Sequence, residues 1–131
     1  MTRWRLLTIS VVLIAVLFAG CGGTDQIRLG WSGANRPSRI GYSYVTFTGK
    51  EVGSFRAAVD QTITLNYTAI VNKGTLSIRV RNLQGQSLWQ AELDEDKNDS
   101  VQIPVEQAGI YTVLVEGQDT GGGFGVTWEV K

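Results

Sequence analysis

Histidine is absent from all 131 residues, and cysteine occurs once, at Cys21. Without histidine, the chain has no Ser-His-Asp or Cys-His catalytic group and no imidazole ligand for a metal ion. A single cysteine cannot form an intrachain disulfide bond. An excess of one charge is also lacking, because twelve Lys+Arg balance twelve Asp+Glu, which argues against nucleic acid as a partner. The composition therefore indicates a protein that is not an enzyme and that binds no cofactor.

The longest apolar run, residues 6–20, follows a short basic segment at residues 1–5. As a helix this run would extend roughly 22 Å, which is less than the roughly 30 Å of a bilayer's hydrocarbon core. A basic segment, a short apolar helix and small residues in that order are typical of a secretory signal peptide. Positive charge before the run keeps that end cytoplasmic, so we expect the rest of the chain to be exported.

The end of the run, Leu17-Phe18-Ala19-Gly20-Cys21, resembles a bacterial lipobox, with small residues before an obligatory cysteine. The resemblance implies cleavage between Gly20 and Cys21 and a covalent lipid, such as palmitate, on Cys21. Each buried methylene contributes about 0.8 kcal/mol, so two or three acyl chains give durable membrane attachment. The protein would then be extracytoplasmic and anchored to the cell membrane, or to the outer membrane if the host has two membranes. The alternatives are an ordinary signal peptide with an incidental thiol and an uncleaved anchor.

Three parts follow from these patterns: a signal peptide at 1–20, a lipidated cysteine with a flexible tether at 21–39, and a β-domain at 40–131. The tether prediction depends on its Gly, Ser, Asn and Arg content, on Pro37 and on the lack of periodicity. Trp31 is the one large apolar group in this range. It either docks on the domain, which we favour, or lies at the lipid headgroup boundary.

Apolar and polar residues alternate with a period of two from residue 42 onward, which predicts strands with one face on a core. Eight short strands are predicted, at 44–48, 52–58, 63–71, 76–80, 89–93, 101–105, 111–115 and 124–130. Turn-forming residues separate them at 49–50, 72–74, 82–86 and 119–123. Trp89 and Trp128 are in phase with the core positions. The pattern predicts an all-β fold, an antiparallel eight-stranded, jelly-roll-like β-sandwich after the helical signal segment.

The order of turn and core motifs resembles the bacterial pre-peptidase C-terminal domain and related small lipoprotein β-sandwiches. The motifs are Phe47-Thr48-Gly49, Asp60-Gln61-Thr62-Ile63, Gly74-Thr75-Leu76, Ala108-Gly109-Ile110-Tyr111 and Gly123-Phe124-Gly125-Val126-Thr127-Trp128. The resemblance implies a jelly-roll-like accessory module of secreted proteins rather than a catalyst. Some members bind calcium through acidic residues beside an Asp-Leu pair, and Gly74-Thr75-Leu76 lacks that aspartate.

The acidic segment 94–99 is the best local candidate for a metal site. Asp94, Asp96 and Asn98 place oxygen ligands at alternate positions, as at the start of a calcium loop. The sixth position is Asp99 instead of glycine, and the twelfth is Val105 instead of glutamate. We therefore favour a solvated hairpin tip whose charges discourage edge pairing.

Two tyrosines are the candidate ligand-binding residues. Tyr42 and Tyr44 share one face of the first strand, where they form an aromatic platform for a sugar ring or close the edge of the core. Tyr111 follows Ala108-Gly109, and we expect its hydroxyl to bond to the backbone, as tyrosines do at sandwich corners.

The sequence predicts a membrane-anchored lipoprotein that serves as a non-enzymatic binding or accessory module of the cell envelope. Its ligand would be a protein or a polysaccharide, and lipid anchoring would raise its local concentration near such partners. The alternative is a structural subunit of an envelope protein complex that uses an exposed sheet edge for strand addition.

Overall fold

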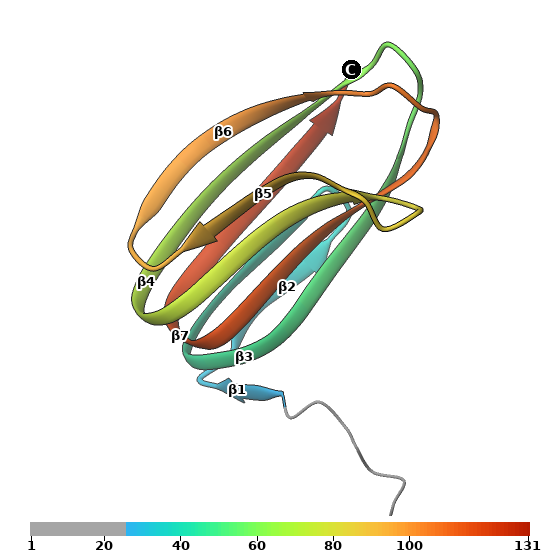
Figure 1. Cartoon of the computed structure of the whole chain (residues 1–131). Helices are drawn as coiled ribbons and strands as arrows, with labels where there is room; N and C mark the ends of the chain where they lie inside the picture. Colours follow the sequence, from blue (N-terminus) through green and yellow to red (C-terminus); the bar gives the residue numbers. More distant parts are fainter. Residues whose placement is uncertain (1–25) are drawn as a thin grey trace, which may run out of the picture.

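The computed structural model describes residues 26–131, which form seven strands and no helix (Figure 1). The strands are β1 (Ile27–Leu29), β2 (Ser32–Arg36), β3 (Arg39–Ala57), β4 (Thr62–Asn82), β5 (Ser87–Leu93), β6 (Lys97–Pro104) and β7 (Gly109–Val130). Every strand pair is antiparallel. The all-β antiparallel prediction is confirmed, with seven strands instead of eight. The predicted signal segment and Cys21 lie outside the described residues, and no membrane-spanning helix is found within them.

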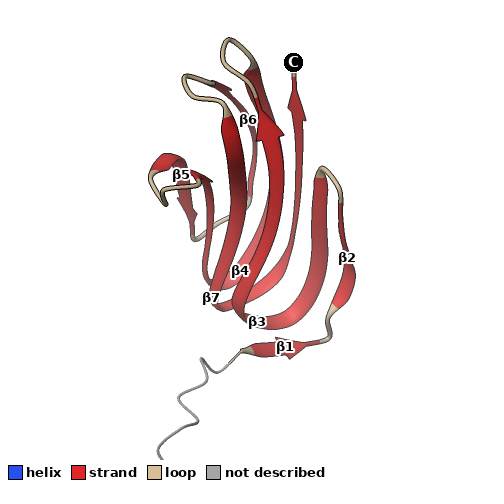
Figure 2. Ribbon diagram, turned by 90° about the vertical axis from the view of Figure 1, so that its right-hand side faces the viewer, coloured by secondary structure: helices blue, strands red, loops and turns tan. Residues whose placement is uncertain are grey.

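Three long strands, β3, β4 and β7, bend back on themselves and so pass through both layers of the fold (Figure 2). Residues 39–44 of β3 pair with residues 122–127 of β7, whereas residues 49–57 pair with residues 109–117. β4 divides in the same way, because residues 63–71 pair with 122–130 of β7 and residues 75–82 pair with 111–118. Layer A therefore has the order β2-β3-β7-β4-β6, and layer B has the order β3-β7-β4-β5.

The strand count was wrong because three pairs of predicted strands are halves of one bent strand. The segments predicted as turns at 49–50, 72–74 and 119–123 are the bends, and the register of pairing shifts close to them. Gly74 shows why glycine occurs there. Its φ is 64°, and an added Cβ would lie only 2.1 Å from the Asp119 carbonyl oxygen. Glycine permits such a backbone, and a bulged strand can then continue into the other layer. The predicted turn at 82–86 is a true reversal, with Asn82 N–H bonded to the Gln86 carbonyl at 3.1 Å.

The sheet begins at Ile27, within the range predicted as a tether. β1 pairs with residues 46–48 of β3, and β2 pairs with residues 39–43. Backbone pairing along the free edge of β3 needs no apolar alternation, so a polar, glycine-rich segment can form these strands. Trp31, between β1 and β2, stacks on Tyr42 with ring centroids 4.1 Å apart. The predicted docking of Trp31 on the domain is therefore confirmed.

The core lies between the two layers and consists of the inward-facing residues of the long strands. Its fully buried members include Ile40, Phe47, Ile63, Leu65, Leu76, Ile78, Val80, Val113, Val115 and Val126. Trp128 is buried, and Trp89 is half-buried against Tyr67, as their strand phase predicts. The Tyr111 hydroxyl donates to the Gln107 carbonyl at 2.5 Å, which confirms the predicted bond to backbone.

Candidate functional site

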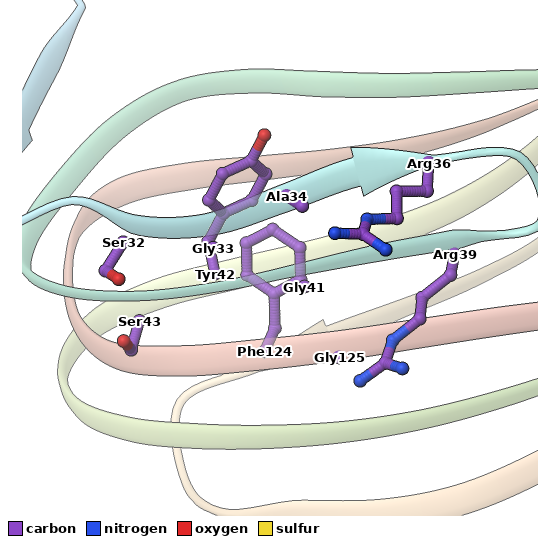
Figure 3. A pocket seen from close by; sticks show the side chains of 10 residues that line it. All are labelled: Ser32, Gly33, Ala34, Arg36, Arg39, Gly41, Tyr42, Ser43, Phe124 and Gly125. Carbon is purple, nitrogen blue, oxygen red and sulfur yellow. The ribbon is translucent and has the colours of Figure 1, made fainter.

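An open groove crosses the outer face of layer A, on the side away from the core. Its first section, about 720 Å³, is lined by ten residues of β2, β3 and β7, which Figure 3 shows. A second section of about 450 Å³ continues across β4 and β6. The two sections share Arg39 and Gly125, so they form one groove. With strands about 4.8 Å apart, a path from β2 to β6 is about 19 Å long.

The floor of the groove is a row of residues that are direct partners on neighbouring strands. Ala34 of β2 is opposite Gly41 of β3, and Gly41 is opposite Gly125 of β7. The same row continues through Thr68 of β4 to Asn98 of β6. Ala34, Gly41 and Gly125 have no side chain beyond Cβ, so the floor at β2, β3 and β7 is almost bare backbone.

Neither backbone conformation nor packing requires glycine at positions 41 and 125. Both residues lack the positive φ that favours glycine. A Cβ added to Gly125 would meet no atom within 4 Å, and at Gly41 the nearest atom would be 3.7 Å away. At Gly53, by contrast, an added Cβ would lie 2.5 Å from the Trp128 ring. Glycine in a strand interior weakens the strand, so Gly41 and Gly125 indicate close approach of another molecule.

Polar side chains form one wall of the groove, parallel to the floor. Cross-strand pairing places the following residues in one row: Arg36, Arg39, Thr127, Asn66 and Ser100. All five are exposed. The opposite wall is lower, with Ser32 and Ser43 followed by Gly123 and Ile70. Guanidinium, amide and hydroxyl groups provide both donors and acceptors, so this groove can hydrogen-bond an elongated ligand rich in hydroxyl groups.

The side chains of the predicted platform residues Tyr42 and Tyr44 lie in the aromatic cluster at the edge of layer A, and Tyr42 is also one of the ten residues that line the first section of the groove. Tyr44 is 7% exposed, and burial raises the pKa of its hydroxyl to about 12, an effect that the nearby Thr120 hydroxyl partly offsets. Tyr42 is half-buried beneath Trp31 and beside Phe124. Both tyrosines thus belong to an aromatic cluster at the edge of the core, and the Trp31 ring stacks on both of them.

Arg28 covers the outer side of this aromatic cluster. Its guanidinium lies 4.4 Å from the Trp31 ring centroid, and Nη1 is 2.5 Å from Oε1 of Glu51. The other carboxylate oxygen of Glu51 accepts a hydrogen bond from Asn35 Nδ2 at 3.0 Å. β1 and β2 are thereby joined to the layer B half of β3, and the Trp31 ring contacts both Tyr42 and the Arg28 guanidinium.

The acidic candidate residues are divided between a connection and a strand. Asp94 and Asp96 lie between β5 and β6, and the Asp96 carboxylate accepts the Val71 backbone N–H at 2.9 Å. Asn98 lies within β6, where its Oδ1 accepts a hydrogen bond from the Thr68 hydroxyl at 3.3 Å. Among residues 26–131, no three His, Cys, Asp or Glu side chains gather as metal ligands would. The connection joins strands of different layers, so it is not the tip of a hairpin.

Similarity to known proteins is confined to the fold. No family model and no curated protein matches the sequence, so the resemblance to the pre-peptidase C-terminal domain stays a prediction. The solved structure of TmCBM61 in complex with β-1,4-galactotriose matches with a TM-score of 0.51 and 13% identity over 70% of each chain. A structure described as CBM4 covers 79% of this chain and 78% of its own, with a TM-score of 0.49 and 8% identity. The chain thus has a β-sandwich fold like that of a carbohydrate-binding module.

Proposed function

We propose that this chain is a non-enzymatic carbohydrate-binding module of the cell envelope, anchored to a membrane by lipid on Cys21. The observation that carries the proposal is the groove of layer A, in which Gly41 and Gly125 keep the floor free of side chains at β3 and β7. A polysaccharide is long, extended and covered with hydroxyl groups, and it matches such a groove in shape and hydrogen bonding. TmCBM61, which shares the fold, was solved with a β-1,4-linked galactose trisaccharide, and this also favours a polysaccharide over a protein ligand.

The strand-addition alternative receives less support from the edges of layer A. β2 has five residues and is followed by Pro37, which has no N–H to donate. β6 begins at Lys97 and ends at Pro104. Short edge strands, charges and prolines are devices that prevent edge-to-edge pairing. A ligand on the face of layer A therefore accounts for more of the structure than a strand added to its edge.

Anchoring would increase the usefulness of a shallow groove. A lipid on Cys21 would confine the domain near the envelope, so that modest affinity for each polysaccharide segment suffices. We propose an extracytoplasmic location, on the outer membrane if the host has two. Incorporation of labelled palmitate tests this directly: the wild-type chain should carry label and Cys21→Ser should carry none. An unlabelled wild-type chain would contradict the anchor while leaving the groove unaffected.

Carbohydrate binding is tested with residues 22–131, which contain the seven strands and the core that the structure describes. We expect a glycan array to show retention, and we expect Asn66→Ala to weaken it because Asn66 is an exposed member of the polar wall. Gln90→Ala is the matched control, because Gln90 is exposed on layer B and lies away from the groove. Retention of no glycan, or equal retention by both variants, would contradict the proposal.

A further inference from the structure

Two arginines lie directly opposite each other at the first section of the groove. Arg36 of β2 pairs with Arg39 of β3 across the two-residue turn at 37–38. Figure 3 shows both side chains on the groove side, with the Arg39 guanidinium next to Gly125. Like charges directly opposite in an antiparallel pair destabilise the strands. The pair therefore costs folding free energy unless something compensates for it.

No carboxylate within residues 26–131 forms an ion pair with Arg36 or Arg39, and the one carboxylate that lines the groove is Asp99 of β6, in the second section. The ion pairs there join Arg28 to Glu51, Lys73 to Asp119 and Lys131 to Glu129. Neither Arg36 nor Arg39 donates a side-chain hydrogen bond in the described part of the chain, although Arg28 on the same edge donates three. Both arginines are exposed, so their guanidinium donors are available to a ligand in the groove.

We infer that the ligand of the groove is an anionic polysaccharide, and that Arg36 and Arg39 together bind one of its carboxylate or phosphate groups. This inference rests on the proposed function. The guanidinium fork matches both oxyanions in geometry, and two such groups around one anion remove the repulsion between them. The uncharged wall at Thr127, Asn66 and Ser100 remains for sugar hydroxyls. The charged end thus selects the class of polysaccharide, and the rest of the groove holds its chain.

Polygalacturonate and its fully methyl-esterified form are the matched probes, because esterification removes the carboxylate charge, adds one methyl group for each sugar and leaves the polysaccharide backbone unchanged. We expect residues 22–131 to bind polygalacturonate at least about tenfold more tightly than the ester, since hydrogen bonds to charged groups are the stronger ones. Binding should weaken as salt is added. Dextran phosphate, a polysaccharide that carries phosphate groups, is the second anionic probe, and binding that depends on Arg36 and Arg39 identifies the oxyanion that the pair accepts as carboxylate, phosphate or both.

Arg36→Gln and Arg39→Gln should each reduce affinity for the anionic probe by about tenfold and reduce affinity for the methyl ester much less, because a hydrogen bond to a neutral group is weaker than one to an anion. Arg56→Gln is the control. Arg56 is exposed on layer B, so this substitution removes the same charge outside the groove. Equal binding of polygalacturonate and its ester, or unchanged binding by both groove variants, would overturn the inference. If the domain then binds a neutral glycan and Asn66→Ala weakens that binding, the proposed function stands. Absence of binding to any glycan would overturn both.

Discussion

Replacing Gly125 with valine should make the domain more stable and its groove inactive. Glycine in a strand interior costs about 0.5–1 kcal/mol relative to alanine, and β-branched residues are preferred in strands on a scale of about 1 kcal/mol. A Cβ at Gly125 meets no atom within 4 Å, so this atom of the valine introduces no clash. We expect the free energy of unfolding to rise by about 1 kcal/mol, which corresponds to a rise in Tm of about 4 °C.

The same valine would project from the middle of the floor, between Gly41 and Thr68. A ligand that approaches the backbone at this point would be displaced, and we expect its affinity to fall at least tenfold. Thermal melting and glycan binding on the same sample separate this result from misfolding, which would lower both. Ser54→Val, on the exposed face of layer B, is the control that should leave binding unchanged. A Gly125→Val domain that binds glycan as tightly as the wild type would refute the reasoning about the floor.

Three further predictions concern the fold that supports the groove. Gly53→Ala should destabilise the domain by about 1–3 kcal/mol in urea unfolding, because its Cβ would lie 2.5 Å from the Trp128 ring; an unchanged midpoint would show that the ring moves freely. Trp31→Ala should cost about 2 kcal/mol by removing the ring that packs on Tyr42, whereas a mere tether residue would cost nothing. Because burial raises the pKa of Tyr44 to about 12, the folded state keeps a proton that the unfolded state loses near pH 10, so stability should fall between pH 10 and 12. Over that range the free energy of unfolding of Tyr44→Phe should fall less than that of the wild type, by on the order of 2 kcal/mol. Equal falls in the two proteins would contradict the raised pKa of Tyr44.

The class of fold was predictable because the period-two alternation reports directly which side chains face the core. Ile63, Leu65 and Tyr67 are all buried, as their spacing predicts. The strand count was not predictable in the same way. Glycine and asparagine at residues 72–74 permit either a hairpin or a bend, and only the pairing of both halves of β4 with β7 distinguishes the two.

The groove was not predicted from the sequence because the middle of its floor is formed by two glycines, which carry no side-chain signal. Gly125 followed a run of glycines, and that run indicated a turn. Only the pairing of β3 with β7 shows that Gly41 and Gly125 lie opposite each other on an exposed face. Arg36 and Arg39 lie within the range predicted as a tether, where a charged residue indicates neither a strand nor a binding site. The aromatic residues did attract attention, but an alternation pattern cannot show that Trp31 covers Tyr42.

The most direct test of the account is an NMR titration of ¹⁵N-labelled residues 22–131 with polygalacturonate. The backbone amides of Gly41, Gly125, Thr68 and Asn98 form the floor of the groove, and the account predicts that their signals shift together and saturate. Amides on the outer face of layer B, such as those of Ser54 and Gln90, should stay in place. Shifts confined to layer B, or to the aromatic cluster around Trp31, would contradict the claim that this groove binds the polysaccharide.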